Sequence, residues 1–331
     1  MKDIYDILRQ WRKRPDANFA LATMVRAQGS SYRRPGARML ICEDGTTAGS
    51  LSAGCLESEV AECARKVLRT GQSVVVSFDT RRRFGCAGKI DIFIERVSHS
   101  FLCEVAACLN ARRTCFAVTT LEGSFVGKAD SFPREANGFP NSPFVEEIFP
   151  PLRLLIFGDG PDNAPFRSLG QFLGWETIEI IDANLFSITP DAWTAAIVKS
   201  HNYGRDFVTL QKLLPLELRY VGLIGPRKRR DQIMSELLEV GVTVNAGFFA
   251  PAGLNLGAET PEEIALEIVA EIQRVFADGS GLSLREKKIP IHAESTWPPT
   301  TQSFRAKSRN PVASSKGNAA GSFDSASLRS G

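Results

Sequence analysis

LLIFGDGPDNAP (residues 154–165) is the stretch that decides the fold. Its four leading apolar residues suit a buried strand, and they run into the glycine turn Gly158-Asp159-Gly160. A helical apolar pattern follows over residues 166–173, and a second β-like run over 178–181 ends at Asp182. Strand, glycine turn, helix and strand in this order predict a βαβ unit with parallel strands.

The same alternation continues toward the C-terminus. The further predicted elements are strands at 195–199 and 219–224 and helices at 207–214, 229–240 and 261–276. Thr260 is the expected N-cap of the last helix, with Pro261 at its first position. We therefore expect a Rossmann-like domain over residues 152–277, in which helices cover both faces of a parallel sheet.

Residues 1–132 follow a different pattern. Apolar residues at helical spacing predict helices over 4–11 and 56–68, the second ended by Gly71. Short β-like runs lie at 19–25, 39–42, 74–78, 90–95 and 114–120. The fold class predicted for the whole chain is α/β, with a small α+β N-terminal domain followed by the Rossmann-like domain.

Two segments are predicted to lie outside these domains. Residues 133–151 contain five prolines, which suit neither a helix nor a central strand, and are expected to form a linker. Residues 278–331 are rich in Ser, Gly, Asn and basic side chains, and are expected to form a disordered basic tail.

Composition excludes several classes of protein. The chain has 331 residues, 43% of them apolar and 23% charged, with a net charge of +3, as in ordinary globular proteins. No apolar run is long enough for a membrane span, and residues 1–11 carry charges where a signal peptide would be apolar. We therefore expect a cytoplasmic location and neither a nucleic-acid nor a membrane partner.

The seven cysteines have no paired C-x-x-C spacing, which disfavours a disulfide framework and a zinc ribbon. Cys55 follows Gly54 in GSLSAGCLE (residues 49–57), at the start of a predicted helix. There the helix dipole favours a thiolate, which binds soft metals or attacks sulfur, although a buried structural cysteine is the alternative. Cys86, in GCAG (85–88), is a second candidate thiol. The cysteines expected in the core are Cys42, Cys63, Cys103, Cys108 and Cys115.

A polar loop at residues 29–38 contains the candidates for anion binding. They are Ser30, Ser31, Arg33, Arg34 and Arg38. Guanidinium forks and hydroxyls suit a phosphate or the edge of a pterin, but a surface turn would contain similar residues.

The second domain has its own candidates. Gly158, Gly160 and Asp182 partly match a dinucleotide fingerprint, yet Asn163 stands at the third glycine position and Pro165 lacks an N–H. A Rossmann-like sheet without a nucleotide therefore remains open, and Asp182 has the alternative role of capping the next turn.

Two basic features mark the expected carboxyl edge of the sheet. His201 directly follows a strand, at the edge where open α/β sheets bind ligands. Arg227 belongs to PRKRR (226–230), whose cations oppose the dipole of the helix that they open. An anion among them would explain this placement, and a solvated charged face is the alternative.

Five blocks of sequence resemble the XdhC and CoxI family of xanthine dehydrogenase accessory proteins, across most of residues 15–276. They are QGSSYRRPGARMLICEDGTTAGSLSAGCLES, FGCAGKIDIFIE, LLIFGDGPDNAP, YVGLIGPRKRR and GLNLGAETPEEIALEIVAEI. The resemblance implies a protein that binds molybdenum cofactor (molybdopterin), protects it during sulfuration and delivers it to a xanthine dehydrogenase-type molybdenum hydroxylase. A cysteine desulfurase is the implied sulfur donor, and we expect a homo-oligomer.

The resemblance also assigns residues. The family's glycine-rich cysteine falls on Cys55 and its later Cys-Gly-Gly on Cys86-Ala87-Gly88. Its Ser-Ser-x-Arg-x-Pro-Gly falls on Ser30, Ser31, Arg33, Pro35 and Gly36, and its Thr-His on Ser200 and His201, with Asp206 as the acidic residue that follows. Ala53 and Ala87 replace common glycines, and no arginine follows Asp182 as it often does in the family.

We therefore predict a non-catalytic molybdenum cofactor chaperone. Cys55 would contact molybdenum or sulfur, Cys86 would be a second thiol, and Arg33, Arg34 and Arg38 would anchor the pterin phosphate. The alternatives are an NAD(P)-dependent oxidoreductase that uses the Gly158 to Asp182 unit, and a nucleotide-sensing partner protein without a cofactor of its own.

Overall fold

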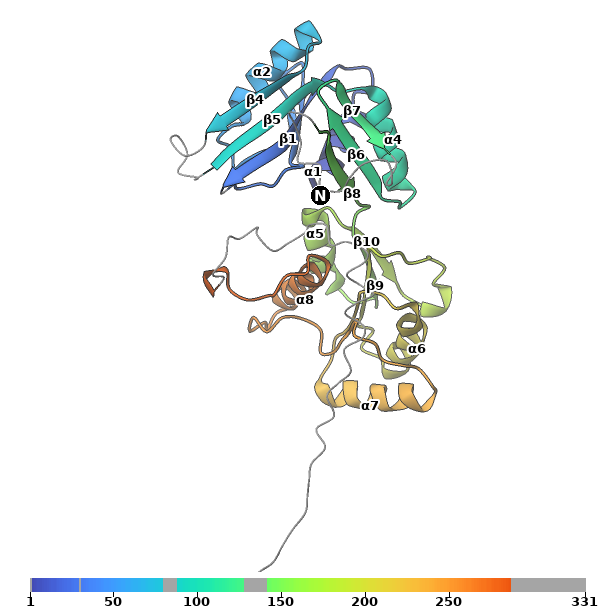
Figure 1. Cartoon of the computed structure of the whole chain (residues 1–331). Coiled ribbons are helices and arrows are strands. Elements are labelled where there is room, and N and C mark those ends of the chain that lie inside the picture. Colours follow the sequence, from blue (N-terminus) through green and yellow to red (C-terminus); the bar gives the residue numbers. More distant parts are fainter. Residues whose placement is uncertain (1, 30, 80–87, 128–141, 287–331) are drawn as a thin grey trace, which may run out of the picture.

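The computed structural model describes residues 2–29, 31–79, 88–127 and 142–286 (Figure 1). The N-terminal elements form one body of mixed helices and antiparallel strands, and the elements after residue 150 form a second body below it in the view of Figure 1. The tail predicted for 278–331 is described only as far as residue 286, and the rest lies outside the described residues. In the described part of the chain, no helix has the length and apolar content needed to cross a bilayer.

A five-stranded antiparallel sheet organises the N-terminal body, in the order β3-β2-β1-β5-β4. Its strands are β1 (Phe19–Gly29), β2 (Arg38–Cys42), β3 (Thr47–Gly49), β4 (Val74–Asp79) and β5 (Gly88–Arg96). Its helices are α1 (Lys2–Arg12), α2 (Glu57–Thr70) and α4 (His99–Asn110). Side chains alternate along β1, so Ala20 and Ala22 pack toward α2 while Phe19 and Leu21 pack toward α1 and α4. The sheet therefore has a helical layer on each face.

A smaller sheet lies beside it, in the order β7-β6-β8. Its strands are β6 (Cys115–Thr120), β7 (Gly123–Gly127) and β8 (Phe144–Ile148). β8 falls inside the predicted linker 133–151, so the structure differs from that prediction over residues 144–148. As an edge strand, β8 needs backbone partners on one side only, and β6 supplies them.

All strands of the second body are parallel, and their order is β10-β9-β11-β12-β13. They are β9 (Arg153–Phe157), β10 (Glu176–Ile180), β11 (Thr194–Val198), β12 (Tyr220–Leu223) and β13 (Phe248–Phe249). The first strand lies between the second and the third, so the chain reverses its course across the sheet between β9 and β11. In doubly wound folds, ligands bind at such a switch point, beyond the carboxyl ends of the strands.

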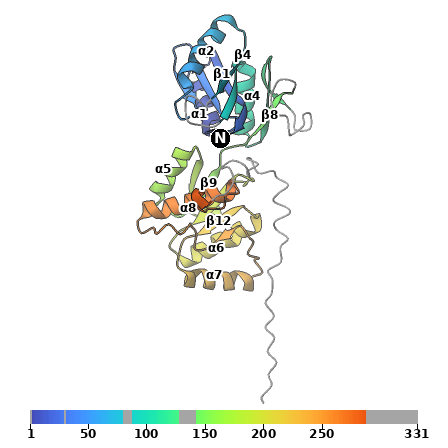
Figure 2. The same ribbon diagram turned by 60° about the vertical axis from the view of Figure 1, so that its left-hand side comes forward.

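Helices cover both faces of this sheet, as predicted (Figure 2). They are α5 (Asn163–Leu173), α6 (Tyr203–Leu213), α7 (Arg227–Glu239) and α8 (Pro261–Phe276). α5 and α8 share one apolar core with the sheet, and α6 and α7 share the other. The N-cap predicted for α8 is confirmed, because Thr260 forms a capping box with Glu263. The observed fold is thus the predicted α/β class, with an α+β part before a Rossmann-like part.

Charged residues join the two bodies at the amino ends of the parallel strands. Arg112 follows α4 and has a left-handed backbone with φ of 52°. Its guanidinium donates to Glu176, at the start of β10, over 2.9 Å and to both carboxylate oxygens of Asp191. Tyr5 adds a hydrogen bond from its hydroxyl to the Phe149 carbonyl, at 2.7 Å. The junction is therefore held by directed polar contacts.

Candidate functional site

The turn between β3 and α2 presents a thiol at the surface. Ser52 organises it, because its Oγ accepts the N–H groups of Gly54, Cys55 and Leu56 at 3.2, 3.0 and 3.3 Å. Gly54 has φ of 107°, which is a left-handed conformation that favours glycine. Cys55 is exposed on this turn, as the sequence predicts for an approachable thiol.

Glu57 anchors the same turn from the first position of α2. Its carboxylate accepts the N–H of Leu51 at 3.2 Å, the N–H of Ser52 at 2.8 Å and the Ser52 hydroxyl at 2.6 Å. Burial raises the pKa of Glu57, but these hydrogen bonds outweigh burial and hold the pKa below its usual value. The anion at the start of α2 is thus Glu57. The N–H groups of Gly54, Cys55 and Leu56 in the turn are therefore taken by Ser52 and Glu57, and the role of the helix N-terminus toward the Cys55 thiol stays a prediction.

Replacing Glu57 by Ala is expected to loosen this turn and to lower the free energy of unfolding by about 1–2 kcal/mol, since hydrogen bonds to a partly exposed carboxylate are lost. Thermal melts at neutral pH measure the loss. Because the folded pKa is depressed, the contribution of the carboxylate is present above the unfolded pKa and disappears as pH falls through the folded pKa. The difference between variant and parent should therefore shrink as the pH falls below the usual pKa of a glutamate.

Glu62→Ala is the matched control, because Glu62 is an exposed carboxylate on the same helix. It should leave the melting temperature within about 1 °C of the parent. Equal melting temperatures for the Glu57 and Glu62 variants at neutral pH would refute the anchoring role.

The three arginines of the polar loop have different environments. Arg33 pairs with Asp3 on α1 and donates to the Ser50 hydroxyl at 2.8 Å, so it borders the Cys55 turn. Arg34 is half-buried, and burial lowers its pKa. Arg38 is only 2% exposed and pairs with Glu146 on β8, so it links the two sheets rather than facing a ligand. Burial therefore disfavours Arg38 as a phosphate anchor.

The remaining candidates of this half have different outcomes. Ser31 is half-buried, and Ser30 and Cys86 lie outside the described residues. Cys42 and Cys115 are buried as expected, and burial raises the pKa of Cys115 to about 12. Cys103 is exposed on α4, contrary to its predicted place in the core, because the helix turns it away from the sheet.

A buried lysine lies at the switch point of the parallel sheet. Lys199 follows β11, and its fully buried ammonium donates to Asp162 Oδ1 and Asn163 Oδ1, both at 2.7 Å. Asn163 in turn donates to the Gly158 carbonyl at 2.9 Å and to Glu179 at 2.7 Å. Lys199 and Asp162 were not among the predicted site residues. The sequence did contain a signal for Lys199, because this lysine directly follows the apolar run TAAIV (residues 194–198).

This arrangement fills the place where a dinucleotide fold holds its pyrophosphate. A Cβ added to Gly160 would clash with Asp162 Oδ1, so the carboxylate covers this glycine. The N–H groups of Asn163 and Ala164 already bond to carbonyls of the turn at 3.1 and 3.2 Å. Burial raises the pKa of Asp162, but the bond from Lys199 outweighs it, so the carboxylate stays ionised. This geometry disfavours NAD(P).

His201 lies at the same edge and has a left-handed backbone with φ of 53°. Its Nε2 is 3.6 Å from Asp162 Oδ2, and its side chain is 67% exposed. Beside it, the buried carboxylate of Asp206 accepts the Ser200 N–H at 3.0 Å, the Ser200 hydroxyl and the Arg229 guanidinium. The residues Ser200, His201 and Asp206 are thus brought together at the carboxyl edge.

Two other candidates at this edge have simpler roles. Asp182 is exposed and accepts the Asn184 N–H at 2.8 Å, which is the capping alternative considered above. Arg227 is exposed at the start of α7, whereas Arg229 pairs with Asp206 and Arg230 with Asp231. Two of the four cations near which the sequence suggested a bound anion therefore form ion pairs with carboxylates of the protein itself.

A metal site would need several ligating side chains close together. Among residues 2–29, 31–79, 88–127 and 142–286, no group of three or more His, Cys, Asp or Glu side chains could hold a metal ion. Within this part of the chain, a ligand at the Cys55 turn would therefore meet one protein thiol and neighbouring backbone and hydroxyl groups.

The fold defines a two-part protein, with an α+β half before a Rossmann-like half. The exposed thiol of Cys55 lies in the α+β half. The chain belongs to the XdhC and CoxI family: the model of that family matches residues 13–79, and the XdhC Rossmann domain matches residues 154–272. The first match includes Cys55 and the second includes Lys199.

Individual relatives agree with this assignment. The chain is 28% identical to a protein of Bacillus subtilis described as a probable xanthine dehydrogenase subunit, over 76% of this chain and 91% of that protein. It is 24% identical to the molybdenum cofactor insertion chaperone PaoD of Escherichia coli, over 77% and 82% of the two chains. A crystal structure described as a xanthine dehydrogenase from Bacillus halodurans superposes with a TM-score of 0.71 at 26% identity, covering 83% of this chain and 96% of that one.

Proposed function

We propose that this protein is a molybdenum cofactor chaperone, which binds the cofactor through Cys55 and delivers it to a xanthine dehydrogenase-type molybdenum hydroxylase. The observation that carries the proposal is the exposed thiol on a turn fixed by Ser52 and Glu57, within the region matched by the family model. The similarity to a molybdenum cofactor insertion chaperone supports the same role.

The residues around the turn suit this cargo. A thiolate is a soft ligand of the kind that binds molybdenum or carries sulfur. Ser52 and Glu57 hold the turn in one shape, so the thiol need not be ordered when the cargo binds. Arg33 borders the turn through Ser50 and carries the positive charge that a pterin phosphate needs, although its pairing with Asp3 has to be shared or exchanged.

The proposal extends to partners and location. In it, the protein shields the cofactor during sulfuration, a cysteine desulfurase supplies the sulfur, and the exchange takes place in the cytoplasm. We further propose that the protein acts as a homo-oligomer. Cys86 remains a candidate for a second thiol.

Replacing Cys55 by Ser is expected to lower bound molybdenum cofactor at least several-fold, because a hydroxyl is a poor soft-metal ligand. The protein should be purified without oxygen from cells that make the cofactor. Acid oxidation then converts the bound cofactor to a fluorescent pterin, which is measured per protein chain.

Cys103→Ser is the control for this variant, because Cys103 is also exposed but lies on α4, away from the turn. It should keep the parent's cofactor content. Equal content in the Cys55 and Cys103 variants would overturn the assignment of Cys55. Native mass spectrometry of the parent separates the proposal from the oxidoreductase alternative, since the former predicts bound pterin and the latter a dinucleotide.

A further inference from the structure

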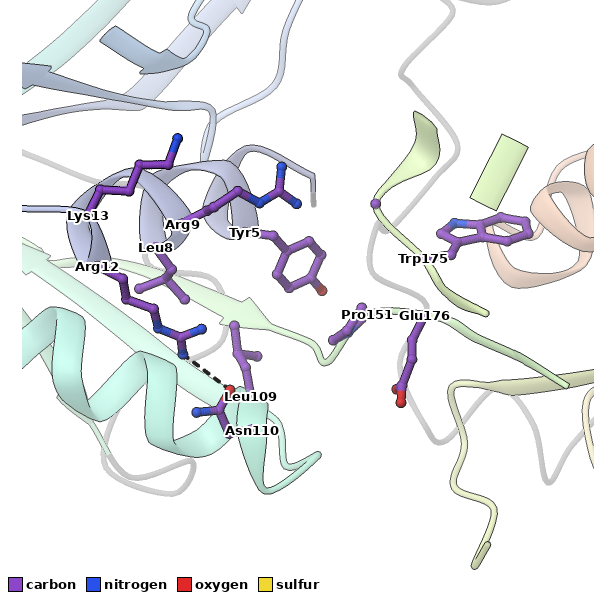
Figure 3. A pocket seen from close by; sticks show the side chains of 11 residues that line it. Tyr5, Leu8, Arg9, Arg12, Lys13, Leu109, Asn110, Pro151, Trp175 and Glu176 are labelled. Atoms are coloured by element: carbon purple, nitrogen blue, oxygen red, sulfur yellow. Dashed lines mark hydrogen bonds between the residues drawn. The ribbon is translucent and has the colours of Figure 1, made fainter. Parts of the chain in front are cut away.

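Several polar side chains that line the groove between the two bodies have partners within the protein (Figure 3). Arg9 pairs with Asp6, and Arg12 donates to the amide oxygen of Asn110 at 3.2 Å. Glu176 accepts from two arginines of the junction. The interior of the α+β half differs from this groove, because some of its buried polar atoms lack such partners.

A cluster of buried polar side chains lies between the two sheets of the α+β half. We call it the inter-sheet cluster, and its members are Thr23 on β1, Arg38 on β2, Glu95 on β5, Thr119 on β6 and Ser124 on β7, each between 0% and 7% exposed. Glu95 accepts the Ser124 N–H at 2.8 Å, and the hydroxyls of Thr119 and Ser124 share a hydrogen bond of 2.9 Å. The five-stranded sheet and the smaller sheet therefore meet through polar groups here.

The strand register brings three of these side chains onto one face of the five-stranded sheet. Thr23 lies opposite Arg38 on one side and opposite Phe93 on the other, and Glu95 follows two positions after Phe93. Paired residues, and residues two apart on a strand, point to the same face. Burial raises the pKa of Glu95, while hydrogen bonds from Ser124 and the charge of Arg38 act against this rise. The short Thr23 therefore separates two long side chains that interact across it.

Four polar atoms of the inter-sheet cluster have no hydrogen-bond partner among the residues that the structure describes. They are Thr23 Oγ1, Arg38 Nε, Arg38 Nη2 and Glu95 Oε1, and each is shielded from the outside solvent. Arg38 Nη1 pairs with Glu146, and Glu95 Oε2 accepts from Ser124, so each side chain uses only part of its bonding capacity. Nε and Nη2 share one edge of the guanidinium, an edge that commonly donates two parallel hydrogen bonds. Buried polar atoms in folded proteins nearly always have a partner, either in the protein or in ordered water.

We infer that one internal water molecule binds at the inter-sheet cluster and bonds to all four of these atoms. Buried water typically forms two to four hydrogen bonds with polar groups that the protein leaves unsatisfied. Arg38 supplies two donors, and Glu95 Oε1 and Thr23 Oγ1 supply two acceptors, which together match the two lone pairs and two protons of water. An anion matches less well, because ionised Glu95 would repel it. The inference does not depend on Cys55 or on the proposed function.

A crystal structure of the full chain, at a resolution that shows ordered water, tests the inference directly. We expect one water molecule within about 2.7–3.2 Å of Arg38 Nε, Arg38 Nη2, Glu95 Oε1 and Thr23 Oγ1. A direct ion pair between Arg38 and Glu95 would overturn the inference, because it would occupy the same atoms. A bound anion at the guanidinium edge, or no ordered density there, would overturn it as well.

Thr23→Val gives an independent test in solution. Valine has nearly the shape of threonine but lacks the hydroxyl. If the hydroxyl accepts from bound water, the variant loses this bond and leaves the water with fewer partners, so the melting temperature should fall by about 2–4 °C. If the hydroxyl has no partner at all, its removal should leave the melting temperature unchanged or raise it, and that result would overturn the inference.

Two threonines of the same half serve as matched controls. Thr47→Val, at an exposed position of β3, should keep the melting temperature within about 1 °C of the parent. Thr119→Val removes the bond to Ser124, so it gives the size of the drop expected for one lost buried hydrogen bond. Circular dichroism establishes that each variant is folded. A Thr23→Val variant as stable as Thr47→Val would contradict the bound water.

Discussion

Lys199→Met is expected to lower the free energy of unfolding by about 2 kcal/mol, because it removes the charged hydrogen bonds of a fully buried ammonium to Asn163 and to Asp162, whose side chain is 27% exposed. The ammonium is fully buried and binds Asp162 and Asn163, which together hold the turn after β9. Met preserves much of the side-chain volume, so the loss reports the charge and its hydrogen bonds. Chemical denaturation followed by circular dichroism measures it.

A double variant makes this expectation specific. Asp162→Asn removes the charge that Lys199 balances, so the combined Lys199→Met and Asp162→Asn variant should be more stable than Lys199→Met alone. Lys228→Met, at an exposed position of α7, serves as the control and should change stability by less than about 0.5 kcal/mol. A cost below about 1 kcal/mol for Lys199→Met would show that this cation is dispensable to the fold.

Asp206→Ala is expected to cost about 3–5 kcal/mol, the largest effect of any single change considered, because it leaves a guanidinium without its buried counter-charge. Asp206 is fully buried and accepts from the backbone and hydroxyl of Ser200 and from Arg229. It thereby ties the end of β11 to α6 and α7. Denaturant titration of the variant and the parent gives the difference.

Asp206→Ala combined with Arg229→Met tests the cause. If the loss comes from an unpaired cation, the double variant should regain part of the stability that the single variant loses. Asp231→Ala, at an exposed acidic position of α7, should have little effect. A double variant no more stable than Asp206→Ala would mean that the contacts to Ser200 account for the cost.

The fold was largely predictable because its signals are local. Helical spacing in Ile4, Ile7, Leu8 and Trp11 gives α1, and the capping box at Thr260 gives the start of α8. α4 was not predicted, because its sequence HSFLCEVAACLN is apolar on most sides and has weak periodicity. β8 was not predicted, because a short edge strand among prolines becomes visible only once β6 lies beside it.

The candidate sites were less predictable, because their partners are distant in sequence. Cys55 and Gly54 could be found from a short glycine-rich motif, but the anchoring by Glu57 depends on how the turn folds back. Lys199 meets Asp162 across 37 positions, and Arg38 meets Glu146 across 108. A charge at such a position looks like a solvated residue or a ligand contact until the three-dimensional packing shows its partner.

The direction of the parallel strands separates two ends of the second body. The strands begin at the junction held by Arg112 and run away from it, so the edge with Lys199 and His201 lies roughly 15 Å further on, at the length of a five-residue strand (Figure 1). A ligand bound at that edge would therefore not reach the contacts of Arg112 at the junction. Any influence of one end on the other would have to be measured as a coupling free energy between them.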